Sequence, residues 1–204
     1  MTDLLKLLVG FLLTTVFGGS LGHYFQNRAW RHQFRVRLLE AELASATRLF
    51  EDLSRLMDKR LYRMRQVHWK LKQPVLGEIL EVHMERYREV LYEWNDALNR
   101  NLALTETYFG LDIKKTLEGT IYEEFRRIGE VLESEYRKLS GGGPLYDSQK
   151  TAADLTRLRD SIYRINVHMI RTIQQRQQGL SQVGQESNRA SIGVALNAGL
   201  PADT

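Results

Sequence analysis

The sequence has no cysteine and only three prolines in 204 residues. Without cysteine the chain cannot form a disulfide, a thiolate metal site or a cysteine nucleophile. Few prolines, together with runs rich in Leu, Glu, Arg, Gln and Ala, favour helices throughout the chain. The chain also lacks a phosphate-binding Gly-Lys loop, a Gly-x-Ser-x-Gly turn, a His-Glu-x-x-His pair and a dinucleotide fingerprint. The sequence therefore predicts an all-α protein without a familiar enzymatic motif.

Metal-binding pairs are missing as well. Metal sites in helical bundles usually use a glutamate three residues before a histidine. The corresponding positions hold other residues: Arg65 before His68, Leu80 before His83 and Ile165 before His168. We therefore expect neither a metal nor another cofactor.

An apolar segment, residues 4–25, stands near the N-terminus. As a helix it would be about 33 Å long, close to the ~30 Å hydrocarbon thickness of a bilayer. Four arginines follow it before the first acid, Glu40: Arg28, Arg31, Arg35 and Arg37. By the positive-inside rule this basic flank lies in the cytoplasm. We predict that residues 1–26 are a transmembrane anchor, which places the protein in the inner membrane with its N-terminus outside.

Two alternatives remain for this segment, a cleaved signal peptide and a buried core helix. A signal peptide would carry its positive charge before the apolar region, whereas here the charge follows it. A core helix would suit the strictly apolar run, residues 7–21, which is shorter than a usual span. Gly18, Gly19 and Gly22 share a face of the segment on which another helix could pack closely, and this pattern favours self-association.

Beyond the anchor, apolar residues recur at steps of three and four, which predicts amphipathic helices. We expect an antiparallel four-helix bundle over residues 27–179, with helices over about 27–72, 75–109, 112–139 and 147–178, the first continuous with the anchor. Gly110 is expected to end the second helix, and Asp112 to cap the third. Residues 180–204 have little that could fill a core and are expected to be a mobile tail.

The first helix is longer than the second, so its part nearest the anchor is expected to lack a partner within the chain. Phe34 and Leu38 would then be exposed unless other copies surround them. This expectation, together with the glycine face, predicts a homo-oligomer.

Charge is unevenly distributed along the chain. Residues 28–72 hold 12 Lys and Arg against 5 Asp and Glu, whereas residues 73–140 hold 9 against 14. Within the first arm, seven cations are interleaved with aromatic residues: Arg55, Lys59, Arg60, Arg63, Arg65, Lys70 and Lys72. They predict either a surface for nucleic acid, anionic lipid or an acidic protein, or a helix face neutralised by glutamates of the second helix. Arg60 lies on the apolar stripe, where its charge must reach a carboxylate, a phosphate or the surface, and of these we expect the surface.

Within this stretch, Arg63 is followed by four residues and then by His68. This spacing resembles the motif of HEPN ribonucleases, which are also helical bundles. The resemblance covers six residues, and Met64 stands where the motif often has a polar residue. It implies that Arg63 would bind the phosphate and that His68 would help to activate the 2′-hydroxyl.

Taken together, the sequence predicts a membrane-anchored, homo-oligomeric helical bundle that acts by assembly and protein contact as a scaffold, sensor or membrane-perturbing effector, without catalysis. The alternatives are a metal-independent ribonuclease of the HEPN type and a module that binds nucleic acid or anionic lipid.

Overall fold

The structure is a computed structural model that describes residues 2–73, 77–140, 146 and 148–197. Some side chains before residue 33, that of Ser140 and all after residue 182 lie outside the described set. The elements are helices, in the order α1 (Thr2–Leu71), α2 (Gly77–Phe109), α3 (Leu111–Thr116), the π-helical η1 (Leu117–Tyr122), α4 (Glu123–Ser140) and α5 (Gln149–Asn197). The predicted all-helical bundle is confirmed, and the first helix continues from the apolar segment into the bundle.

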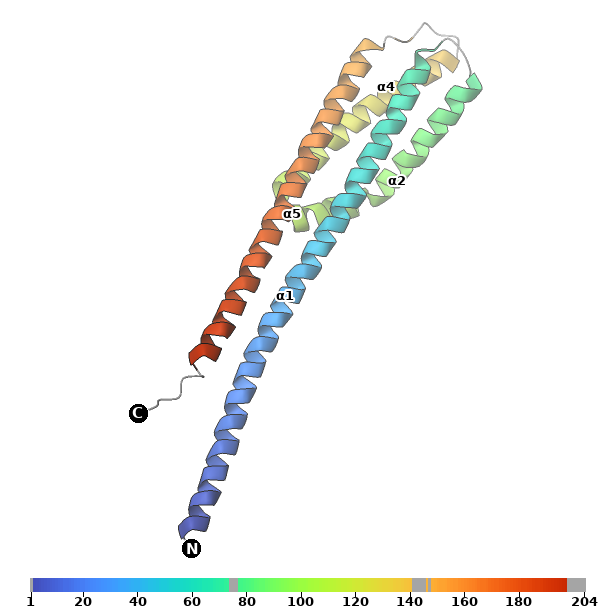
Figure 1. Cartoon of the computed structure of the whole chain (residues 1–204). Helices are drawn as coiled ribbons and strands as arrows, with labels where there is room; N and C mark the ends of the chain where they lie inside the picture. Colours follow the sequence, from blue (N-terminus) through green and yellow to red (C-terminus); the bar gives the residue numbers. More distant parts are fainter. Residues whose placement is uncertain (1, 74–76, 141–145, 147, 198–204) are drawn as a thin grey trace. The chain divides into compact units, whose positions relative to one another are not determined.

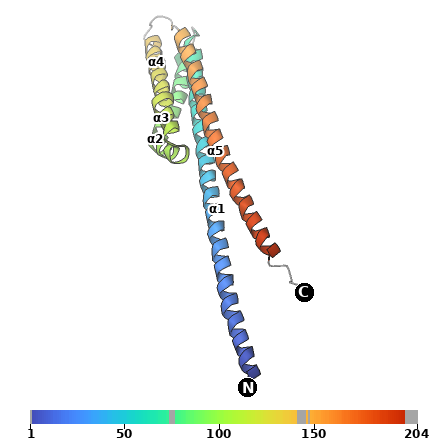
Figure 2. The same ribbon diagram turned by 90° about the vertical axis from the view of Figure 1, so that its left-hand side faces the viewer.

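The chain forms two compact units, of which the larger spans residues 43–177. In this unit, α1 and α2 run in opposite directions on either side of a short connection, and α4 and α5 do the same (Figures 1 and 2). The segments α3 and η1 lead from the end of α2 to the start of α4 (Figure 1). Short connections between amphipathic helices produce this antiparallel order.

The predicted stripes fill most of the core of the larger unit, and Leu49, Leu56 and Met84 join it from outside these stripes. Each helix contributes apolar side chains at steps of three and four, and their burial removes apolar surface from water. Buried side chains include Ala46, Leu53, Met57, Met64, Val67 and Leu71 from α1, Tyr87, Val90 and Trp94 from α2, Phe125, Ile128 and Leu132 from α4, and Leu155, Leu158, Ile162, Ile165, Met169 and Ile173 from α5.

The π-helical segment η1 was not predicted, although the sequence contains its cause. From Ile113 through Leu117 and Ile121 to Phe125, three successive steps are of four residues, and all four side chains are buried. At about 100° per residue, each step of four would turn about 40° too far in an α-helix, so three steps would drift by about 120°. A π-helical turn holds more residues per turn and keeps these side chains on one face.

The turn between α2 and α3 was predicted in part. Gly110 adopts a φ of 91°, which glycine reaches without strain because it has no Cβ. It also precedes α3 as the N-cap residue, without a side-chain cap. The prediction that Asp112 caps this helix is therefore wrong, because Asp112 lies in its first turn.

The second unit combines residues 1–42 with 178–204. In its part of α1, Trp30, Phe34 and Leu38 are 63%, 58% and 51% exposed, as predicted for Phe34 and Leu38. The rings of Trp30 and Phe34 stack with centroids 5.7 Å apart. In the other part of this unit, α5 continues to Asn197, beyond the predicted end at residue 178. The rest of the predicted tail, residues 198–204, lies outside the described residues.

Among the residues that the structure describes, no helix is both long enough and apolar enough to cross a membrane.

Candidate functional site

The structure distributes the seven cations of the basic stretch over different surroundings. Arg55 pairs with Asp52 on the same exposed face of α1, and Lys59 reaches Glu93 of α2 at 2.6 Å. The ammonium group of Lys70 lies 4.8 Å from the ring centroid of Trp69. Arg65 and Lys72 are exposed. The predicted neutralisation by α2 is thus seen at Lys59, and the seven cations do not form one continuous surface.

Arg60 is the exception, and the prediction that it reaches the surface is wrong. Only 1% of the surface of Arg60 is exposed to solvent. The guanidinium carbon lies 4.6 Å from the ring centroid of Phe125 and 5.4 Å from that of Trp94. Aromatic faces are electron-rich, so they attract the cation and let it lie where the stripe calls for an apolar residue. Arginine at this position is therefore a cation enclosed by the core.

Tyr87 supplies the polar contact of this cation. Its hydroxyl oxygen accepts a hydrogen bond from the Arg60 guanidinium, which raises the pKa of Arg60 against the larger, lowering effect of burial. Burial in turn raises the pKa of Tyr87, so the phenol remains neutral at physiological pH. Among the described residues, neither Nε nor Nη1 of Arg60 finds a hydrogen-bond acceptor. The buried guanidinium is thus incompletely paired.

Gly129 of α4 provides the space for this arrangement. A Cβ atom at this position would collide with the hydroxyl oxygen of Tyr87. The missing side chain therefore lets the Tyr87 hydroxyl lie against α4, where it can contact Arg60. Sequence patterns did not identify Gly129, because a glycine inside a helix carries no mark of what packs against it.

A cleft of about 280 Å³ opens beside Arg60 between α1, α2 and the η1–α4 segment. We call it the Arg60 cleft. Its lining includes Tyr87, Tyr122, Arg126 and Arg137, with Glu130 and Glu133 as the carboxylates. The cleft therefore combines cationic, hydroxyl and carboxylate groups around one buried charge.

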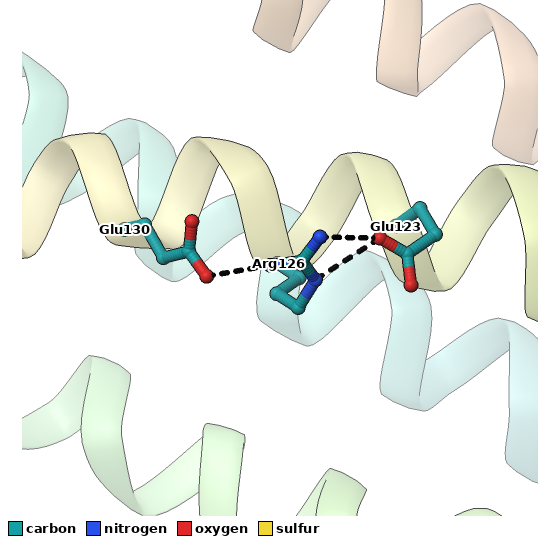
Figure 3. A network of polar contacts seen from close by, with 3 residues as sticks. All are labelled: Glu123, Arg126 and Glu130. Carbon is teal, nitrogen blue, oxygen red and sulfur yellow. Dashed lines mark hydrogen bonds and ion pairs between the residues drawn. The ribbon is translucent and has the colours of Figure 1, made fainter.

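Both carboxylates of the cleft already have cationic partners. Glu133 accepts two hydrogen bonds from Arg88 of α2, each of 2.8 Å, and this pairing lowers the pKa of Glu133. Glu130 accepts a hydrogen bond of 2.8 Å from Arg126, which also donates to Glu123 (Figure 3). Glu123, Arg126 and Glu130 all belong to α4, and Figure 3 shows their side chains in one row along this helix.

The two residues of the ribonuclease-like motif have different neighbours. His68 is buried, and its Nδ1 lies 2.9 Å from the hydroxyl oxygen of Tyr146. The guanidinium of Arg63 lies 5.7 Å from the ring centroid of Tyr62. Burial lowers the pKa of His83, and the charges of Lys70, Arg86 and Arg63 lower it further. The structure of one chain thus does not bring Arg63 and His68 into a common cleft.

The residues assigned to the membrane segment and its flank lie in α1. Arg31, Arg35 and Arg37 are exposed. The surroundings of Gly18, Gly19 and Gly22 and the side chain of Arg28 lie outside the described residues.

The part of the chain that the structure describes has no cluster of His, Asp and Glu side chains suited to a metal ion. Comparison with protein-family models, with curated proteins and with solved structures finds no match for this chain. The chemistry of the Arg60 cleft therefore has to be argued from its own residues.

A substitution at Gly129 tests the packing of the cleft. Gly129→Ala should lower the free energy of unfolding by about 1–3 kcal/mol, because overpacking against Tyr87 outweighs the better helix propensity of alanine. Gly119→Ala is the matched control, since its methyl group would meet nothing within 4 Å. Urea unfolding followed by circular dichroism measures both. Equal effects of the two substitutions would contradict the close contact.

The pH dependence of stability tests the environment of His68. Burial and the charge of Lys72 lower the pKa of His68 from its ordinary 6.5 to about 4. Between these values the unfolded chain binds a proton that the folded chain does not, so stability present above pH 6.5 is lost as the pH falls. As the pH is lowered from 6.5 toward 4, the urea concentration at the midpoint of unfolding should fall less steeply for His68→Gln than for the wild type. An unchanged slope would refute this assignment.

Proposed function

We propose that this protein is a single-span protein of the inner membrane whose cytoplasmic helical bundle assembles with other copies of itself and acts through protein contact. The roles that fit are a scaffold, a sensor or a membrane-perturbing effector. The partners would be the membrane, a second copy of the chain and a further protein that receives or sends the signal.

The observation that carries this proposal is the exposed apolar stripe of Trp30, Phe34 and Leu38 on α1. Side chains at spacings of four lie on one side of a helix, where they can meet the same stripe of another copy. Three neighbouring exposed apolar side chains of this size are costly in water and are typical of a contact surface. A membrane anchor would hold the copies in one plane and raise their effective concentration.

The anchor itself is supported by the sequence and by two described side chains. Residues 4–25 include no Asp, Glu or Arg and a single Lys, and Arg31, Arg35 and Arg37 follow. Phe11 and Tyr24 within this segment are exposed, as expected for side chains that face lipid or the lipid–water interface.

Assembly is tested by removing the stripe. The double substitution Phe34→Gln and Leu38→Gln should reduce crosslinked oligomers in native membranes several-fold, because it removes the apolar surface between copies. Tyr163→Gln is the matched control, since Tyr163 is an exposed aromatic residue on α5, outside the stripe. If crosslinking of the wild-type protein in native membranes gives monomers alone, assembly is refuted. An equal loss with Tyr163→Gln would refute the stripe as the interface.

Orientation is tested with reporters fused after Thr204. If the N-terminus is outside and the bundle is in the cytoplasm, a fluorescent protein fused there should fold and fluoresce, while alkaline phosphatase should stay inactive because it needs the oxidising periplasm. Replacing Arg31, Arg35 and Arg37 with glutamine should weaken this bias. An active phosphatase fusion on the unmodified chain would overturn the proposed topology.

A further inference from the structure

Arg60 carries a charge that its surroundings in the folded chain do not balance. The effects that shift the pKa of Arg60 come from burial, Tyr87 and Tyr122, and no carboxylate is among them. The rings of Trp94 and Phe125 and the hydroxyl of Tyr87 stabilise the cation, but Nε and Nη1 find no acceptor among the described residues. Burying a guanidinium in this way is unfavourable unless an anion completes its hydrogen bonds.

The two carboxylates that line the Arg60 cleft are already engaged. Glu133 is held by Arg88 through two hydrogen bonds, and Glu130 by Arg126 through one. Moving Glu133 toward Arg60 would break both of its hydrogen bonds with Arg88, and moving Glu130 would remove one of the two carboxylate partners of Arg126. An anion from outside the bundle could pair with Arg60 without breaking these contacts.

The Arg60 cleft has the size and the chemistry to admit that charge. Its volume of about 280 Å³ lies just below the range of about 300–1,000 Å³ that is typical of small-molecule pockets. The exposed side chain of Arg137 lines the same cleft, and Tyr122 adds a hydroxyl group. Arg126 also lines it but is paired with Glu123 and Glu130, so Arg137 is the cation that would attract an anion toward the buried Arg60.

We propose that the Arg60 cleft is a binding site for a small oxyanion, in which a phosphate or carboxylate group pairs with the guanidinium of Arg60 while Arg137 contacts the ligand from the rim. The planar guanidinium presents its donors in a fork that matches two oxygens of such a group. Arg60 thereby gains an anionic partner that the protein itself does not supply. This site does not depend on the proposed membrane anchor or on assembly.

Titration calorimetry on the full-length chain in mild detergent tests the site, with inorganic phosphate and succinate as probes at constant ionic strength. The wild-type protein should bind at least one probe saturably, and the stronger probe identifies the oxyanion class. Arg60→Met keeps an apolar stem between the rings but removes the charge, so it should weaken binding at least tenfold. It should also unfold at the same or a higher temperature than the wild type without ligand, because an unpaired buried charge is lost.

Two exposed arginines complete the test. Arg137→Gln should weaken binding several-fold without disturbing the fold, and it decides the outcome if Arg60→Met does not fold. Arg159→Gln is the control, because Arg159 is exposed on α5 and pairs with Asp160, away from the cleft. Its affinity should equal that of the wild type. Absence of saturable binding to both probes, unchanged affinity in Arg60→Met, or unchanged affinity in Arg137→Gln would overturn the proposal.

Discussion

The buried guanidinium of Arg60 is the constraint around which α1, α2 and α4 pack, because a charge in the core needs groups around it that stabilise it. It lies against Trp94 of α2 and Phe125 of α4, and Tyr87 of α2 reaches it because Gly129 of α4 has no side chain. A desolvated cation–π contact contributes about 2 kcal/mol and a charged hydrogen bond about 1.5–3 kcal/mol. The burial of one ion costs several kcal/mol. The favourable contacts thus roughly offset the cost, and the remaining donors make the centre of the bundle receptive to an anion.

The other charged pairs act differently because they lie at the surface. Exposed pairs such as Arg55–Asp52 and Lys59–Glu93 contribute little to stability, since water screens them. Their effect is to keep α1 soluble along the bundle. The same helix carries Trp30, Phe34 and Leu38, whose exposure calls for a partner outside the chain. Along α1, the residues that hold the bundle together therefore differ from those that we propose to contact other copies.

Much of the fold could be predicted because the side chains that a helix buries recur at a regular spacing along the sequence. The steps of three and four identified most core side chains of α1, α4 and α5 but missed Leu49 and Leu56, and Gly110 marked the end of α2. The sequence also showed that a charged residue, Arg60, stands on the apolar stripe of α1. It did not show that this side chain stays buried, because no pattern along α1 reveals which aromatic rings of α2 and α4 pack against it. Gly129 was missed for the same reason. The π-helical turn was encoded in three successive steps of four and became recognisable only with the buried face known.

The Arg60 side chain is enclosed by the core, and two of its nitrogen atoms have no acceptor among the described residues. Nuclear magnetic resonance of the full-length chain labelled with ¹⁵N-arginine reports on this through the Nε–H resonance that disappears in Arg60→Met. We expect an Nε proton that exchanges slowly with water and whose resonance moves saturably as phosphate or succinate is added. A rapidly exchanging proton that responds to neither anion would place this guanidinium in solvent and contradict both its burial and the proposed site.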